Sequence, residues 1–171
     1  WGLRDKRTHL FVWGPISEAL FRDKRGNTTC TGNPLTDSLY SRYCSHVKDP
    51  KLLIKFGWDA SRKIVLISAS CLDGSDTKEE MIHYYRTIID SCSNLNFIIK
   101  VHPRDNLENF NTIAKKTNVI ILKDECTFRE LLRISDLNIS HYSATSMDAI
   151  IYGIPVILLP QKALNQKDLE Y

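Results

Sequence analysis

The sequence contains no apolar run long enough to cross a bilayer, which takes about 18–20 residues. It also lacks any C-x-x-C pair. Its five cysteines are odd in number and widely spaced, which indicates reduced thiols in a cytosolic chain rather than a disulfide or zinc framework. A charge excess is missing too, because 23 Lys and Arg face 20 Asp and Glu. This balance predicts no nucleic-acid partner.

The composition is that of an ordinary soluble globular domain, with 43% apolar and 25% charged residues in 171. That length favours one domain over two. The chain begins with Trp1 rather than Met, and we expect it to be a piece of a longer protein.

From residue 63 onward, short apolar runs alternate with helical patterns. The runs cover residues 63–68, 96–101, 118–122, 136–140 and 154–159. Continuous apolar runs are typical of strands buried on both faces of a parallel sheet. Between the first two, apolar residues recur at helical spacing from Met81 to Cys92, and shorter stripes occupy 107–115, 127–134 and 147–151. The pattern predicts an α/β fold with a doubly wound, mostly parallel, Rossmann-like sheet and helices on both faces.

The first sixty residues are less regular. We predict strands at 9–14 and 28–32 and a helix at 17–24 that opens at Ser17. A turn into a helix should follow at 33–44, and the region from Pro50 to Asp59 is interpreted as a looser connection.

Polar segments follow four of the predicted strands, at 68–76, 102–105, 123–127 and 141–146. The carboxyl ends of parallel strands meet at one edge of the sheet, where ligands of such folds bind. We therefore expect these segments to converge.

Ser143, Thr145 and Ser146 fall where a helix should begin. Unpaired N–H groups and the positive end of the helix dipole favour an anion there, and a phosphate would fit. Ordinary N-capping by Ser143 is the alternative. Asp148 could accept hydrogen bonds from a ribose or be a solvated helix residue.

His102 precedes Pro103, whose ring keeps the histidine backbone extended. The imidazole could donate a hydrogen bond to a phosphate oxygen, and the guanidinium of Arg104 adds a positive charge with several N–H donors. The alternative is a loop histidine packed on Pro103. His141, at the end of another strand, is a second candidate, with a purely structural role equally open.

The segments IKVHPRD and DLNISHYSATSMDAIIYGIPVI, with TGNPLTDSL upstream, resemble the carboxyl-terminal half of GT-B-fold glycosyltransferases. The closest motifs are those of capsule and teichoic-acid polymer transferases and of the related UDP-N-acetylglucosamine 2-epimerases. The resemblance runs from about Phe11 to Pro160.

This resemblance implies a donor-binding domain for surface polysaccharide synthesis that binds a nucleotide-activated sugar. The phosphates of this nucleotide-activated sugar would contact His102 and Arg104. They would also contact the hydroxyls of Ser143, Thr145 and Ser146. Asp148 would bind ribose, and the loop around Lys123–Thr127 would lie near the base. Further donor contacts are expected at Ser70, Gly74, Thr127 and His141.

By the same resemblance, residues 1–26 end an amino-terminal half, and residues 27–171 form the donor domain, truncated at its carboxyl end. The missing half would bind acceptor and supply the catalytic base, so this chain should bind donor without turning it over efficiently. No cofactor or metal is expected, since no Asp-x-Asp pair occurs. The chain should be cytoplasmic, and the basic segment 4–9 leaves contact with the inner face of the membrane open.

Two alternatives remain open at this point. A hexose epimerase of the same fold would need paired carboxylates acting as acid and base. A non-catalytic nucleotide-binding module would bind the nucleotide without sugar transfer.

Overall fold

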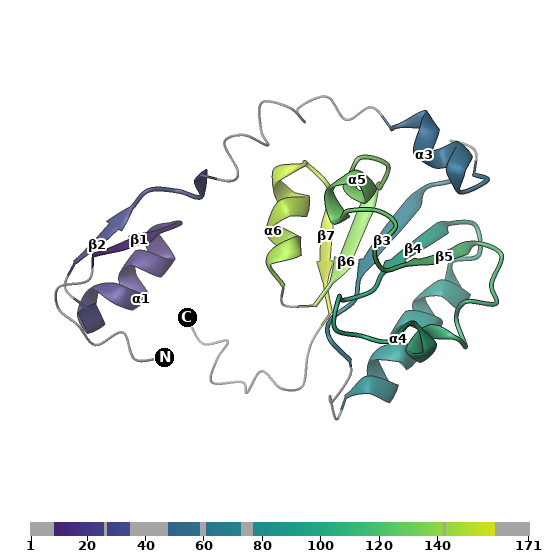
Figure 1. Cartoon of the computed structure of the whole chain (residues 1–171), viewed down its shortest axis with the longest axis horizontal. Helices are drawn as coiled ribbons and strands as arrows, with labels where there is room; N and C mark the ends of the chain where they lie inside the picture. The colour runs from purple at the N-terminus through teal and green to yellow at the C-terminus, as the bar shows by residue number, and fades with distance from the viewer. Residues whose placement is uncertain are drawn as a thin grey trace. The chain divides into compact units, whose positions relative to one another are not determined.

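The computed structural model describes residues 9–25, 27–34, 48–58, 61–72, 77–141 and 143–159. The chain divides into two compact units, Trp1–Cys44 and Ser45–Tyr171. Figure 1 traces the order of elements within each unit. Among the described helices, none is long and apolar enough to cross a membrane.

The first unit is a small β-α-β arrangement. Strands β1 (Leu10–Val12) and β2 (Thr28–Cys30) pair in parallel, and α1 (Pro15–Arg25) connects them. The helix begins at Pro15, not at Ser17 as predicted, because proline has a backbone angle suited to the first helical turn. The β1–β2 pairing joins residues on both sides of position 26, so the compact unit extends past the predicted division. The helix expected at 33–44 falls almost entirely outside the described residues.

The second unit is built on a five-stranded parallel sheet in the order β5-β4-β3-β6-β7. Its strands are β3 (Ile64–Ser68), β4 (Asn96–Lys100), β5 (Val119–Leu122), β6 (Leu137–Ser140) and β7 (Val156–Leu158). All five confirm the predicted runs. The chain starts at the central strand, moves out to β5, then returns to β6 and β7. The fold is therefore doubly wound, with its switch point between β3 and β6.

Helices cover both faces of this sheet, as predicted. Helix α4 (Lys78–Ser91) connects β3 to β4, whereas α6 (Ala144–Ile151) connects β6 to β7 in the opposite direction. Because both crossovers are right-handed, the two helices lie on opposite faces. Helix α5 (Phe128–Leu132) contacts α6. The stripe at 107–115 forms only a short 3₁₀ turn, η1 (Leu107–Phe110).

The predicted loose connection after Pro50 is wrong, because this region contains the helix α3 (Pro50–Lys55). Proline occupies its first turn, where the missing N–H costs nothing. Asp49 caps the helix by accepting a hydrogen bond from the Lys51 N–H at 3.0 Å. Gly57, with a φ of 67°, supplies the left-handed turn that ends it.

The core confirms that the central strands are buried on both sides. All five positions of β3 are buried. On one face, Val65 and Ile67 pack in a cluster with Tyr85 and Ile89 of α4. The edge strand β7 is different, since Ile157 and Leu158 are 47% and 58% exposed.

At the amino ends of the strands, Asp136 joins three segments. Its carboxylate accepts from Lys48 Nζ at 2.5 Å, Lys63 Nζ at 2.9 Å and the Ile64 N–H at 2.8 Å. Burial alone would raise the pKa of Asp136, but these hydrogen bonds together hold that pKa below its ordinary value. The cluster stabilises the edge opposite to the predicted site.

Candidate functional site at the carboxyl edge of the sheet

The polar segments predicted to converge do follow the carboxyl ends of parallel strands. His102 comes two residues after β4, and Ser143 comes three residues after β6. Strand β3 lies between these two strands, so their ends are separated by about 10 Å, two strand spacings. The structure thus places the imidazole and the hydroxyl segment at the same edge, on both sides of the switch point.

Ser143 is the N-cap residue of α6. Its Oγ accepts from the Thr145 N–H at 3.3 Å and from the Thr145 hydroxyl at 3.0 Å. The capping interpretation is therefore confirmed. Ser143 nevertheless remains exposed, and the first turn of α6 contains no acidic residue. The positive end of the helix dipole is left without an opposing charge from its own first turn.

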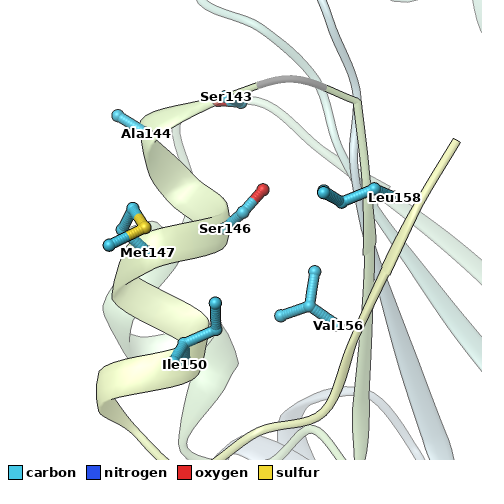
Figure 2. Close-up of a pocket in the computed structure, with 7 residues that line it drawn as sticks. All are labelled: Ser143, Ala144, Ser146, Met147, Ile150, Val156 and Leu158. Carbon is cyan, nitrogen blue, oxygen red and sulfur yellow. The ribbon is translucent and has the colours of Figure 1, made fainter. Parts of the chain in front are cut away.

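Ser146 points away from this exposed cap. Only 7% of the residue is exposed, and its hydroxyl has no hydrogen-bond partner. Figure 2 shows the hydroxyl between α6 and β7, pointing toward Leu158. It borders a pocket of about 530 Å³ with Ser143, Ala144, Met147, Ile150, Val156 and Leu158. These apolar walls make Ser146 a weaker phosphate ligand than Ser143.

His102 is half-buried, and its ring is oriented by its own turn. The Arg104 N–H donates to His102 Nδ1 at 3.2 Å, and the Asp105 N–H donates to the His102 carbonyl at 2.9 Å. A neutral imidazole that accepts at Nδ1 carries its proton at Nε2. The arrangement leaves Nε2 as a donor that suits an anionic oxygen. Arg104 is exposed beside it.

Asp148 lies in the middle of α6 and connects this helix to α5. Its carboxylate lies 3.8 Å from Arg129 Nε of α5, and both side chains are partly exposed. The residue therefore faces α5, the helix that follows the loop predicted to lie near the base. An ion pair at this distance and exposure is weak, so its groups can exchange partners.

Thr127 has a structural role in this loop. Its hydroxyl accepts from the Glu130 N–H at 3.3 Å, and the Thr127 N–H donates to Glu130 Oε2 at 2.7 Å, which forms a capping box for α5. The hydrogen bond from the Thr127 backbone, with that from its hydroxyl, lowers the pKa of Glu130. The predicted contact of Thr127 with the nucleotide donor would therefore compete with its role as the N-cap of α5.

His141 is not at the surface of the site. It is completely buried, and its Nε2 lies 2.8 Å from the Tyr85 hydroxyl. Burial lowers the pKa of His141, so the ring is neutral near pH 7. His141 therefore has the structural role that the sequence left open. Ser70 is half-buried nearby, and Gly74 lies outside the described residues.

Asp105 was overlooked, although it is the last residue of the HPRD segment. Its carboxylate is buried and accepts from the Leu72 N–H at 2.7 and 2.9 Å. Lys123 Nζ donates to the Asp105 carbonyl at 2.8 Å. Lys100, another residue missed, donates to the Cys126 carbonyl at 2.7 Å and also to the Lys123 carbonyl. These bonds tie the loops after β3, β4 and β5 together.

The described loops contain no group of three or more His, Cys, Asp or Glu that could hold a metal ion. The groups at this edge that could bind an anion are hydroxyls, helix N–H groups, the His102 imidazole and the Arg104 guanidinium. All of these donate hydrogen bonds, which suits an anion.

A doubly wound parallel sheet with such hydrogen-bond donors at its switch point defines a Rossmann-like class of α/β domain. The family model described as CDP-glycerol:poly(glycerophosphate) glycerophosphotransferase matches residues 12–161. The chain belongs to this family, and the resemblance found in its motifs is confirmed. Among curated proteins, no relative matches the sequence.

Solved structures show the same fold at low identity. UDP-GlcNAc 2-epimerase from Methanocaldococcus jannaschii has a TM-score of 0.61 and 17% identity, over 95% of this chain and 49% of that protein. The wall teichoic acid polymerase TagF with CDPG has a TM-score of 0.58 and 16% identity, over 88% and 37%. MnaA from S. aureus with UDP has a TM-score of 0.59 and 17% identity, over 85% and 39%. The chain spans about half or less of each of these proteins.

Proposed function

We propose that this chain is the donor-binding part of a transferase that moves a glycerol phosphate or sugar unit from a nucleotide-activated donor to a surface polymer. The donor would be a cytidine or uridine diphosphate derivative. Its phosphates would lie between the start of α6 and His102. Membership of the glycerophosphotransferase family supports the reaction class. The hydrogen-bond donors at the carboxyl edge of the sheet support the proposed position of the phosphates.

The start of α6 carries this proposal. It combines an exposed Ser143 hydroxyl, the N–H groups of a helix terminus and a first turn without acidic residues. Such a terminus stabilises negative charge. In the transfer reaction, charge grows on the departing phosphate, so donors oriented beforehand lower the barrier.

His102 would serve the same leaving group from the other side of the switch point. Its Nδ1 is occupied by the Arg104 N–H, which directs the ring proton to Nε2. A hydrogen bond from Nε2 to a phosphate oxygen is charge-assisted and worth about 1.5–3 kcal/mol. Arg104, exposed in the same turn, would add a positive charge near the phosphates.

Asp148 would bind the ribose by exchanging its weak contact with Arg129 for hydroxyl donors. The β5–α5 loop, held by Lys100 through the Lys123 and Cys126 carbonyls, would bound the base. An epimerase role finds less support. Among the described residues of this edge, the Asp105 carboxylate accepts from the Leu72 N–H and the Asp148 carboxylate faces Arg129, so each of the two has a partner other than a second carboxylate.

Calorimetric titration of the folded chain with CDP-glycerol, CDP and UDP tests the proposal. At least one diphosphate should bind, and His102→Ala should weaken its binding about 10-fold or more, from the loss of a charge-assisted hydrogen bond. His83→Ala provides a matched control, because His83 is an exposed histidine on α4. Absence of binding by all three compounds would reject the proposal. Equal weakening by both substitutions would reject the role of His102.

A further inference from the structure

The buried hydroxyl of Tyr85 lies beneath the candidate site and contacts His141. Tyr85 belongs to α4 and is completely buried. Its hydroxyl lies 2.8 Å from His141 Nε2, with the two rings 5.7 Å apart. Burial raises the pKa of Tyr85, and the nearby Ser70 backbone opposes part of this increase.

Ser70 and His141 follow the strands that define the switch point. Ser70 comes two residues after β3, and His141 directly follows β6. The strands are neighbours, with Ser68 opposite Ser140 in the register. One hydroxyl on α4 therefore contacts His141 at the exit of β6 and lies near Ser70 at the exit of β3.

Packing alone does not require this hydroxyl, because phenylalanine would fill nearly the same volume. The oxygen is the partner of the buried His141 Nε2, which would otherwise lose this hydrogen bond. Burial raises the pKa of Tyr85 and lowers that of His141, so both groups stay neutral near pH 7. Asp105 is the charged group that acts on Tyr85. A neutral pair of this kind is held by hydrogen bonding rather than by charge.

His141 is close in sequence to the N-cap of α6, and the backbone between β6 and this cap is hydrogen-bonded. The Ser140 hydroxyl donates to the His141 carbonyl at 2.8 Å, and the Leu159 N–H donates to the Ser140 carbonyl at 2.8 Å. Ser143, the cap of α6, follows His141 by two residues. With the ring held by Tyr85 and the backbone held at residues 140 and 141, the position of the cap depends on the anchored histidine.

We propose that Tyr85 is a positioning residue for nucleotide binding, whose hydroxyl holds the β6 exit so that the start of α6 faces the donor phosphates. The proposal rests on the proposed function for the identity of the ligand. It assigns to α4 a role beyond that of a core helix.

The test compares Tyr85→Phe with Tyr84→Phe. Tyr84 is the adjacent residue on the same helix, and its hydroxyl donates to Glu80 Oε1 at 2.9 Å, so it provides a matched loss of one hydroxyl. Binding of CDP is measured by calorimetry at a temperature where all variants are fully folded. Amide resonances of Ser70, Ser143 and Thr145 are followed by NMR. Tyr85→Phe should weaken CDP binding at least threefold and shift these three amides, whereas Tyr84→Phe should do neither.

A double variant separates positioning from folding. In Tyr85→Phe/His141→Leu, both members of the hydrogen bond become apolar, which removes most of the penalty of an unpaired buried group. The double variant should recover thermal stability relative to Tyr85→Phe without recovering CDP affinity. If affinity returns together with stability, the role of Tyr85 is structural and the positioning proposal is overturned.

The outcomes also separate this proposal from the proposed function. If the parent chain binds CDP and Tyr85→Phe binds it equally well, the positioning role is overturned and the donor site stands. If the parent chain binds none of CDP-glycerol, CDP and UDP, the proposed function is overturned, and with it the role of the hydroxyl in donor binding.

Discussion

Replacement of Ser143 by aspartate or asparagine separates the two roles assigned to this residue. Aspartate, asparagine and serine are about equally good N-caps, so both variants should keep α6 formed. Aspartate also adds a negative charge at the helix start, which favours the dipole by about 0.3–1 kcal/mol. Ser143→Asp should therefore be as stable as the parent chain, or slightly more stable.

Donor binding should respond in the opposite direction. Two unit charges about 4 Å apart repel by roughly 1 kcal/mol in water and roughly 4 kcal/mol at an effective dielectric constant of 20. Because Ser143 is exposed, the lower part of that range applies, at about 1–2 kcal/mol. Ser143→Asp should thus weaken CDP binding about 5- to 30-fold, whereas Ser143→Asn should stay within about twofold of the parent chain.

Thermal unfolding and calorimetric titration of the three proteins, at two salt concentrations, provide the measurement. The difference between aspartate and asparagine should shrink at high salt, since exposed charges are screened. CDP affinity that is equal for both variants and the parent chain at low salt would refute the placement of a phosphate at the start of α6. A loss of affinity shared by both would indicate a requirement for the serine hydroxyl instead of repulsion.

Two further predictions concern stability. Burial holds the pKa of His141 in the folded chain below its ordinary value of 6.5. As the pH falls below about 6.5, the unfolded chain therefore binds a proton that the folded chain does not bind. The contribution of His141 to the free energy of unfolding should be complete above this pH and should decline as the pH falls toward the folded pKa. Urea unfolding at pH 7.5, 6.5 and 5.5 measures the decline, and His141→Gln should flatten it, while an unchanged slope would show that other groups cause it. At the opposite edge, Asp136→Asn should destabilise the fold by about 1–3 kcal/mol, because it weakens hydrogen bonds to a charged group, and should leave CDP affinity unchanged. A change in affinity without a change in melting temperature would contradict this division between the two edges.

The two histidines that follow strands look alike in the sequence but have different surroundings in the structure. Side chains alternate between the faces of a strand, and His141 shares the face of Ile139, which packs in the α4 cluster. Alternation along β6 could have indicated this face. The partner of the ring, Tyr85, lies 56 positions earlier in the chain, and no local pattern predicts which residue of α4 meets it.

The candidate site shows the same division. Ser143 could be predicted as a cap because serine before a helical stripe satisfies the free N–H groups of that helix. Asp105 could not be distinguished from a solvated loop residue, since its buried bond to the Leu72 N–H spans 33 positions. The outward or inward direction of Ser146 likewise depends on β7, which packs beside α6.

Short-range chemistry in the sequence alone determined the strands, most helix positions, the parallel α/β class and the segments that follow each strand, because burial periodicity and capping act over a few residues. The family was also recognisable from its motifs. Only the tertiary structure decided which of the polar side chains face the edge and which are buried as supports. That choice depends on contacts between residues far apart in the chain, where one buried hydroxyl or carboxylate must find its partner.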